Sequence, residues 1–185
     1  PDINNVMRLL ENHDTDRFLL EDPENLNVYK QAVTMLLTIP GIPQLYYGQE
    51  LLMTGSTKKD FGYVRPDMPG GWNGDEISVF QESGRTAFNF MKKMLHWRKG
   101  NAAISKGKMK HFMPRSNVYV YERSYNGKSI LVIMNGVNKE VDLDLTFYKE
   151  VIGDRTNSKN VLTDSNVPLG KKLHLQPKEV LVLEL

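Results

Sequence analysis

The sequence predicts an α/β segment over residues 1–100, followed by an all-β domain, an antiparallel β-sandwich, over residues 101–185. Before Gly100, apolar residues recur at helical spacing between short strands, whereas after it nearly every apolar run alternates at period two. The second half also offers strand candidates spaced roughly ten residues apart, a pattern typical of antiparallel sandwiches. Asn126-Gly127 separates two of these candidates and is a strong hairpin turn.

Composition narrows the classes of function. Of the 185 residues, 40% are hydrophobic, enough for one moderate core or two small ones. A net charge of +2 without a dense basic stripe disfavours a nucleic-acid partner, and no apolar run approaches the roughly 20 residues of a membrane span. The lack of cysteine excludes disulfides and thiol catalysis, and it leaves the compartment of a bacterial-type protein, periplasm or cytoplasm, undecided. The first residues resemble neither a translation start nor a signal peptide, so we expect a chain cut from a longer protein.

A strand, a helix and a second strand are predicted at the beginning of the chain. The apolar run Val6–Leu10 predicts a buried strand. A helix over Pro23–Leu37 follows, because Asp22 offers an N-cap before a proline and apolar residues recur on one face. That face comprises Leu26, Tyr29, Ala32, Val33, Leu36 and Leu37. Two prolines within residues 39–43 end the helix, and Gln44–Tyr47 is the second strand.

A long loop and a second helix complete the first half. Residues 49–81 show little periodicity and are expected to lie over the carboxyl end of the second strand. The helix begins at Ser83 or Thr86 and ends at Gly100, after basic residues that suit its C-terminus. Two strand-helix units cannot close a parallel barrel of eight strands, and as an open sheet they would leave both edges bare. We therefore expect the first half to be incomplete on its own.

The second half contains about eight candidate strands. They cover Gly107–Met113, Val118–Tyr125, Lys128–Asn135, Lys139–Leu145, Phe147–Val151, Asn160–Thr163, Lys171–Leu175 and Glu179–Leu185. Tyr119, Tyr121 and Tyr125 share one face of the second of these strands. In a sandwich such a stripe is usually core or rim, and a sugar-binding stripe is the less favoured alternative.

Ionisable residues cluster between Glu11 and Arg17, directly after the first predicted strand. Parallel α/β sheets and barrels place their chemistry at the carboxyl ends of strands. The simpler alternative is that His13 and Asp14 only cap a turn, where aspartate is common. Asp16 and Arg17 favour structural ion pairs, with each other or with loops, although Arg17 could also reach a substrate hydroxyl.

Four motifs occur in order along the chain. They are Asn12-His13-Asp14, Gly41-Ile42-Pro43-Gln44-Leu45-Tyr46-Tyr47-Gly48-Gln49-Glu50, Arg65-Pro66-Asp67-Met68-Pro69-Gly70-Gly71-Trp72 and Leu95-His96-Trp97-Arg98-Lys99. Together they resemble the α-amylase family, in its neopullulanase and cyclomaltodextrinase branch. The resemblance implies that residues 1–100 are the seventh and eighth βα units, the last two, of a (β/α)8 TIM barrel. Residues 101–185 are then the family's C-terminal β-domain.

The resemblance also implies an activity, the hydrolysis of α-1,4 and in some members α-1,6 glucosidic bonds with retention of configuration. The substrates are α-glucan oligosaccharides such as maltodextrins, cyclodextrins or pullulan. Retention requires a nucleophilic carboxylate and an acid/base carboxyl group about 5 Å apart. In this family they come from the fourth and fifth strands, which the chain lacks, so we expect it to be inactive alone. No cofactor is implied for this segment, because the family's calcium sites lie mainly elsewhere; homodimerisation of the parent protein stays open.

Roles for single residues follow from the same resemblance. Asp14 matches the carboxylate that stabilises the transition state, and His13 matches the histidine that donates to hydroxyl groups of the same glucose. Asp60 resembles an acidic residue that holds the next sugar. Related enzymes often pair it with a basic residue, and here Val64 stands at one expected position and Arg65 at the next. Glu50 resembles a family carboxylate that stabilises the end of the eighth strand, so a structural role is expected for it.

The remaining candidates carry weaker signals. Tyr63 and Trp72 could stack on sugar rings or form a small core of their own. The histidines beyond His13 lack metal-ligand spacing, so no metal site is predicted. A noncatalytic carbohydrate-binding or structural module remains the alternative function. A metal phosphohydrolase is suggested by the His13-Asp14 dipeptide alone and is disfavoured, because the sequence holds no second ligand cluster.

Overall fold

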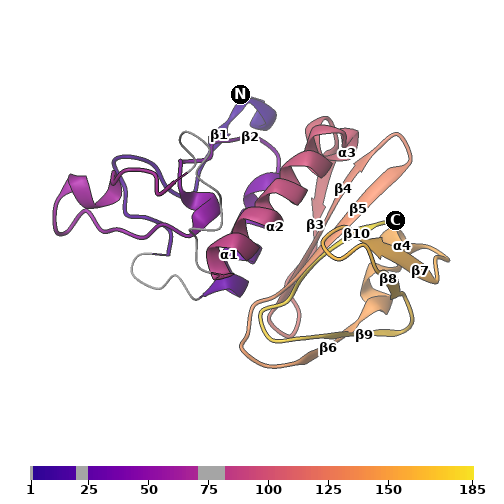
Figure 1. Cartoon of the computed structure of the whole chain (residues 1–185). Coiled ribbons are helices and arrows are strands. Elements are labelled where there is room, and N and C mark those ends of the chain that lie inside the picture. Colours follow the sequence, from indigo (N-terminus) through magenta and orange to yellow (C-terminus); the bar gives the residue numbers. More distant parts are fainter. Residues whose placement is uncertain (1, 20–24, 71–81) are drawn as a thin grey trace. The chain divides into compact units, whose positions relative to one another are not determined.

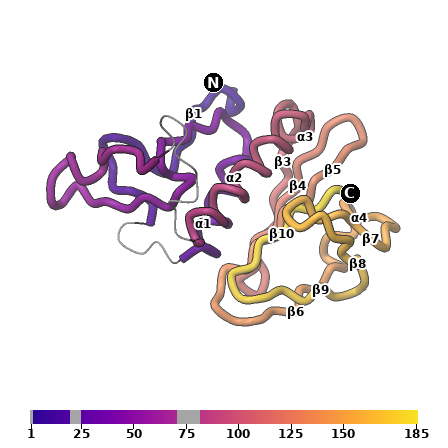
Figure 2. The backbone as a smooth tube through the Cα atoms, viewed as in Figure 1, coloured from indigo at the N-terminus to yellow at the C-terminus, as the bar shows by residue number. Residues whose placement is uncertain are grey.

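The computed structural model describes residues 2–19, 25–70 and 82–185. It divides into two compact units, which Figures 1 and 2 show in the colours of the sequence. The first unit contains the chain up to Leu37 together with Gly41–Leu95, and the second contains Thr38–Pro40 together with His96–Leu185. The division predicted after residue 100 lies near this boundary and remains a prediction for the domains of the protein. None of the helices in the described ranges is both long and apolar enough to cross a membrane.

The first unit is built on a parallel pair of strands. β1 (Met7–Arg8) pairs with β2 (Ile42–Pro43) in parallel, and the helix α1 (Leu26–Thr38) lies between them in the sequence. The amide of Ile42 donates to the carbonyl of Val6 at 2.9 Å, and the amide of Gln44 donates to that of Arg8 at 2.8 Å. The predicted order of strand, helix and strand is therefore present, with parallel pairing.

Both strands differ from their predicted bounds. The second one lies two residues earlier than Gln44–Tyr47, because Gly48 takes a left-handed conformation (φ 78°) and starts the 3-10 helix η2 (Gln49–Leu51). The first is shorter than Val6–Leu10, and it is not buried. Val6 is 41% exposed and Met7 62%, because a sheet of two strands gives them no further layer to pack against.

The two long helices follow their apolar patterns. α1 buries Tyr29, Val33, Leu36 and Leu37, all on the predicted face. Its predicted N-cap, Asp22, and Pro23 lie outside the described residues. α2 (Glu82–Lys99) starts one residue before the predicted Ser83 and ends directly before Gly100. Its buried residues are Gly84, Ala87, Met91 and Met94.

The second unit is dominated by an antiparallel sheet of six strands, in the order β3-β4-β5-β10-β7-β8. These strands are β3 (Lys108–His111), β4 (Val118–Tyr125), β5 (Lys128–Asn135), β7 (Asn157–Asn160), β8 (Asn166–Pro168) and β10 (Val180–Glu184). A separate antiparallel pair consists of β6 (Val141–Asp144) and β9 (Lys172–Leu175). The hairpin between β4 and β5 has positive φ at Asn126 (48°) and Gly127 (77°), which confirms the predicted turn.

Alternate residues of both sheets meet in one hydrophobic core. The six-stranded sheet contributes Val118, Val120, Leu131, Ile133, Leu181 and Leu183, and the pair β6-β9 contributes Val141, Leu143, Leu173 and Leu175. Tyr148 lies in this core and packs edge-on against Phe112, with ring centroids 5.0 Å apart. The two sheets thus enclose a shared apolar layer, as the predicted sandwich requires.

Two predicted strands are wrong. Phe147–Val151 is helical: the 3-10 helix η5 (Leu145–Tyr148) leads into the short helix α4 (Lys149–Ile152), because the Asp144 carboxylate accepts from the amide of Thr146 at 2.9 Å and caps η5. Asn160–Thr163 is mostly a turn, and the strand β7 ends where that prediction begins. β8 was not predicted, because three residues carry too short a pattern.

Arg123 is a fully buried cation on the other face of the sheet. Its Nη1 donates to the carbonyl of Thr38 at 2.6 Å, and its Nη2 donates to those of Ile104 and Gly107, each at 2.8 Å. Ile104 belongs to the short helix α3 (Ala102–Ser105). Tyr121, also fully buried, shares a hydrogen bond with the Thr38 hydroxyl, which agrees with a core role for its side chain.

An exposed pair across β6 and β9 carries a pH dependence. His174 lies opposite Asp142, with 2.9 Å between Nδ1 and Oδ1, and Glu140 is 3.6 Å from Nε2. The hydrogen bond to Asp142 raises the pKa of His174 above 6.5, and it lowers the pKa of Asp142 below 3.8. The stabilisation of the fold by His174 is complete below pH 6.5 and is lost as the pH rises through the pKa of His174 in the folded protein. The stabilisation by Asp142 is present above pH 3.8 and is lost as the pH falls through the pKa of Asp142 in the folded protein.

We expect Asp142→Asn to lower the pKa of His174 toward the ordinary value of 6.5, because the main partner of the imidazolium loses its charge. An NMR titration of the His174 ring protons measures this change. Glu140→Gln serves as the matched control and gives a smaller decrease, since Glu140 is farther from the ring. A wild-type pKa of 6.5 or below would contradict the prediction.

Candidate functional site

A tight turn follows β1 and presents two side chains to solvent. Asn12 shapes the turn: its Oδ1 accepts from the backbone amide of Asp14 at 2.8 Å, and its backbone amide donates to the Thr15 hydroxyl at 2.9 Å. The side chains of His13 and Asp14 are each 61% exposed, although a capping role would turn them to the backbone. Asn12 thus has a structural role in the turn, and its two neighbours are available to a ligand.

Arg65 holds this pair from the loop that follows β2. Its Nη2 lies 3.0 Å from Oδ1 of Asp14, and its Nε donates to the carbonyl of His13 at 2.9 Å. The other carboxylate oxygen of Asp14 is 3.2 Å from Nε2 of His13. Because parallel strands end at the same edge of their sheet, the loops after β1 and β2 meet here. The structure therefore brings together three of the predicted site residues.

Arg17 lies in the interior of the first unit. Its side chain is fully buried and forms an ion pair with Glu11 (Nη1 to Oε1, 2.9 Å), which is itself 2% exposed. It also donates to the carbonyls of Tyr47 at 2.6 Å and Val64 at 3.1 Å. The prediction that Arg17 binds substrate is disfavoured, because such a buried guanidinium presents no surface to a sugar. The structural alternative agrees with these contacts.

Asp16 is also structural, with a partner other than Arg17. Its Oδ1 accepts from the amide of Thr57 at 2.6 Å and from the hydroxyl of the same residue at 2.9 Å. The backbone hydrogen bond lowers the pKa of Asp16 below its ordinary value. Together with Arg17, whose amide donates to the carbonyl of Gly55, Asp16 fastens the turn to the loop after β2.

Asp60 caps the 3-10 helix η3 (Phe61–Val64), since its Oδ1 accepts from the amide of Gly62 at 2.6 Å. The carboxylate is exposed, and among the described residues it has no hydrogen bond to His13 or Asp14. It lies five residues before Arg65 on the same loop. Asp60 thus lies on the same loop as Arg65, which contacts His13 and Asp14, but Asp60 itself forms no hydrogen bond with these two described residues.

Two exposed aromatic rings, those of Phe61 and Tyr63, lie on this loop. Tyr63 is 56% exposed, with the Lys59 ammonium 5.6 Å from its ring centroid. Phe61, which the sequence analysis did not single out, is 50% exposed and lies 5.3 Å from the Arg65 guanidinium. Its only sequence signal was its place directly after Asp60. Trp72 lies outside the described residues. In the described ranges, no three His, Asp or Glu side chains form a group that could hold a metal ion.

Comparison with known proteins gives two family matches. The alpha amylase catalytic domain matches residues 2–120, and the cyclo-malto-dextrinase C-terminal domain matches residues 109–184. The cyclomaltodextrinase of Thermoanaerobacter pseudethanolicus is 30% identical over 185 residues, which cover 98% of this chain and 29% of that protein. A cyclomaltodextrin glucanotransferase from Bacillus sp. is 33% identical over 173 residues, covering 89% of this chain and 22% of that enzyme.

A solved structure shows the same fold. The α-amylase from Geobacillus thermoleovorans, complexed with acarbose, superposes with a TM-score of 0.78 at 23% identity, over 98% of this chain and 39% of that one. These relatives are carbohydrate-active enzymes, and the chain spans between 22% and 39% of their lengths. The chain belongs to the α-amylase family.

Proposed function

We propose that the chain is one part of a retaining α-glucan hydrolase and supplies one wall of its active site. Residues 1–100 are the seventh and eighth βα units of the TIM barrel, and residues 101–185 are the C-terminal β-domain. The observation that carries the proposal is the exposed His13-Asp14 pair, held by Arg65 at the carboxyl ends of two parallel strands. In barrel enzymes this end of the strands is the catalytic face.

Asp14 stabilises the transition state in this proposal. Glycoside hydrolysis passes through an oxocarbenium-like state, in which the sugar ring develops positive charge. A fixed carboxylate stabilises that state more than it stabilises the neutral substrate, which is the condition for catalysis. Arg65 orients the carboxylate through Oδ1, and His13 contacts Oδ2 and donates to hydroxyl groups of the same glucose. Asp60 holds the neighbouring sugar, and the buried Arg17 positions the turn through its ion pair with Glu11.

The bond-breaking carboxyl groups come from elsewhere in the enzyme. The proposed nucleophile and acid/base belong to the fourth and fifth strands, about 5 Å apart across the scissile bond. The exposed faces of β1 and β2 support the need for further strands, since Val6, Met7 and Ile42 are 41%, 62% and 54% exposed. Neighbouring strand-helix units would cover such apolar side chains and pair the open edges.

The substrates we propose are α-1,4-linked and in part α-1,6-linked glucans, such as maltodextrins, cyclodextrins and pullulan. The proposal draws on the named activities of the relatives and on the amylase structure that holds acarbose. The His13-Asp14 pair and Arg65 together offer one imidazole, one anionic and one guanidinium group, which can accept from and donate to sugar hydroxyls.

We expect the 185-residue chain alone to release no sugar from maltoheptaose, cyclodextrin or pullulan, because it lacks the pair of catalytic carboxyl groups. A polypeptide extended at the N-terminus by the coding sequence upstream of residue 1 hydrolyses them. A reducing-sugar assay on both proteins at equal concentration measures the difference. Hydrolysis by the chain alone would refute the division of the site. If neither protein hydrolyses glucan and calorimetry shows saturable binding, the noncatalytic module is the better description.

A further inference from the structure

A hollow in the second unit has the composition of a sugar-binding site. Its volume is about 460 Å³, within the range of about 300–1,000 Å³ that is usual for small-molecule sites. It lies at the ends of β5 and β10, beside the last turn of α2 and the start of α3. The side chains that carry the argument are Trp97, Asn101, Lys128, Ile130 and Glu184.

Part of the lining of the hollow is apolar. It includes Ile130, which is buried, and the indole ring of the partly buried Trp97. The indole N–H donates to Oε1 of Glu184 at 2.7 Å, which fixes the ring in place. Ile130 and Glu184 lie directly opposite each other on the neighbouring strands β5 and β10. A rigid aromatic face beside a polar group suits a pyranose ring, whose C–H face is apolar and whose edge is hydroxylated.

The rim is polar and can form hydrogen bonds. Glu184 uses one carboxylate oxygen for Trp97 and is exposed, so the other oxygen can accept from a hydroxyl group. Asn101 uses its Oδ1 to cap α3, which leaves its amide N–H groups to donate. Lys128 has no ion pair among the described residues. The rim thus combines acceptors and donors beside the apolar part of the lining.

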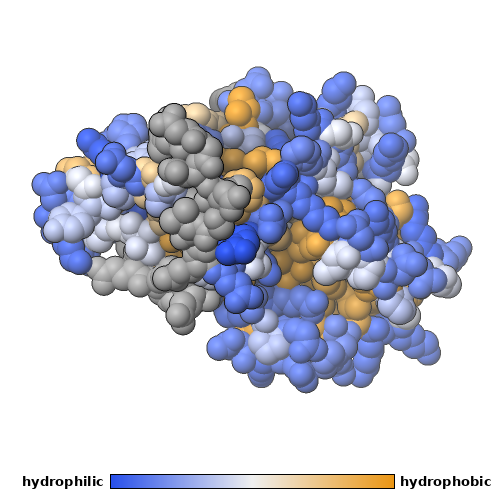
Figure 3. All heavy atoms as spheres, in the orientation of Figure 1, coloured by the Kyte–Doolittle hydropathy of each residue, from blue (hydrophilic) through white to orange (hydrophobic). Residues whose placement is uncertain are grey.

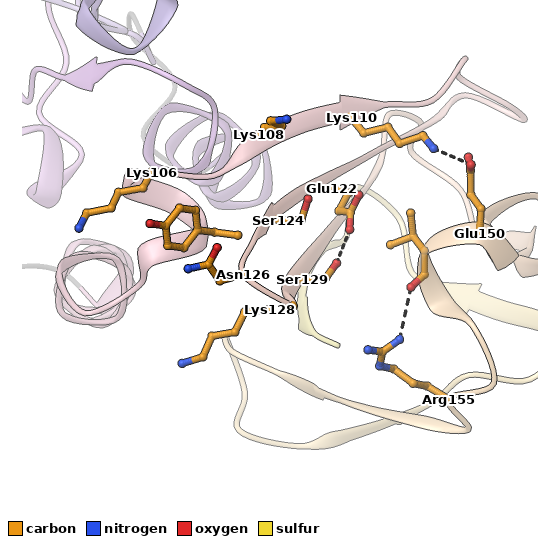
Figure 4. A pocket seen from close by; sticks show the side chains of 13 residues that line it. Lys106, Lys108, Lys110, Glu122, Ser124, Asn126, Lys128, Ser129, Glu150 and Arg155 are labelled. Carbon is orange, nitrogen blue, oxygen red and sulfur yellow. Dashed lines mark hydrogen bonds and ion pairs between the residues drawn. The ribbon is translucent and has the colours of Figure 1, made fainter.

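A second hollow, of about 640 Å³, shares Lys128 and Ser129 with this one and is drawn in Figure 4. Its polar groups are largely engaged with each other: Ser129 donates to Glu122 at 2.6 Å, and Lys110 pairs with Glu150. In Figure 4 the Lys128 side chain points away from the Ser129–Glu122 pair. That hollow contains no tryptophan, and its excess of basic groups would favour an anion instead. The visible face of the molecule is mostly hydrophilic between apolar patches (Figure 3).

We propose that the hollow beside Trp97 is a second glucan-binding site, separate from the His13-Asp14 pair. It holds a maltooligosaccharide segment on the β-domain. The proposal rests on the proposed function for its ligand class, since α-glucan is the sugar that such an enzyme meets. Trp97 stacks on one glucose unit, and Glu184 and Lys128 bind its hydroxyl groups.

The test uses tryptophan fluorescence of the 185-residue chain. The chain has two tryptophans, so Trp72→Phe leaves Trp97 as the only reporter. We expect maltoheptaose to change this fluorescence saturably, at a concentration of about 1 mM or below. Glu184→Gln keeps an acceptor for the indole N–H and loses the charge, so it weakens binding by about tenfold. Lys128→Met weakens it as well, and Asp154→Asn, which removes an exposed carboxylate that does not line the hollow, leaves it unchanged.

Several results would overturn the proposal. One is the absence of a saturable fluorescence change with maltoheptaose. Another is that the Glu184→Gln and Lys128→Met variants bind maltoheptaose as tightly as the chain without these substitutions. A response to inorganic phosphate without a response to maltoheptaose would assign the region to an anion. Circular dichroism and thermal unfolding confirm that each variant is folded. Because the readout is binding, it is independent of hydrolysis: failure of the proposed function leaves a saturable Trp97 signal intact, and failure of this site leaves hydrolysis intact.

Discussion

In the longer glucan hydrolase that we propose, Asp14→Asn is expected to lower kcat/KM on maltooligosaccharides by about 10²–10³-fold, or about 2.7–4 kcal/mol of transition-state stabilisation. Asparagine has the same shape and keeps an oxygen for the Arg65 Nη2, which lies 3.0 Å from Oδ1 in the wild type. It removes the negative charge that, in the proposed mechanism, faces the developing oxocarbenium ion. The decrease therefore falls mainly on kcat, because the neutral substrate gains less from this charge.

Two controls separate this effect from damage to the fold. The Asp14 side chain is 61% exposed, so thermal unfolding of the variant is expected to match that of the wild type. Asp154→Asn removes an exposed carboxylate from the second unit and leaves kcat/KM unchanged. If Asp14→Asn raised KM alone, the residue would contribute only uniform binding. If kcat/KM stayed at the wild-type value, Asp14 would have no place in the site.

Local patterns predicted the β-sheet best. β4 and β5 were predicted to the residue, because the Asn126-Gly127 turn fixes where β4 ends and β5 begins and sets the register between them. The prediction of a strand over Phe147–Val151 failed, because these five residues do not alternate and fit either a strand or a helical turn. The Asp144 cap favours the helical turn. A pattern of five residues cannot decide between these two outcomes.

The candidate site depended on contacts that the sequence does not reveal. Asp14 and Arg65 are 51 residues apart, and their ion pair forms only because the loops after β1 and β2 meet. The burial of Arg17 depends on the carbonyls of Tyr47 and Val64, which are 30 and 47 residues away. The motif resemblance identified His13, Asp14 and Arg65 as candidates. The three-dimensional arrangement was needed to separate the exposed pair from the buried arginine.

Arg123→Met is expected to destabilise the second unit by about 3–5 kcal/mol. Arg123 is fully buried, and its guanidinium donates to three carbonyls, those of Thr38, Ile104 and Gly107. Methionine fills much of the volume and donates nothing, so all three of these hydrogen bonds are lost at once. Burial and the nearby Arg98 lower the pKa of Arg123, because both disfavour the charged form.

Urea unfolding followed by circular dichroism and by tryptophan fluorescence measures this loss, with Arg155→Met as the matched control. Arg155 is exposed and donates to the carbonyl of Ile152 at 3.1 Å, so its replacement is expected to stay within about 0.5 kcal/mol of the wild type. Arg123→Lys should fall between the two, because an ammonium group keeps the charge and cannot reproduce the planar fork that reaches three carbonyls. An Arg123→Met variant within about 1 kcal/mol of the wild type would show that water satisfies these carbonyls in place of the guanidinium, and that the junction of Thr38, α3 and β4 holds without it.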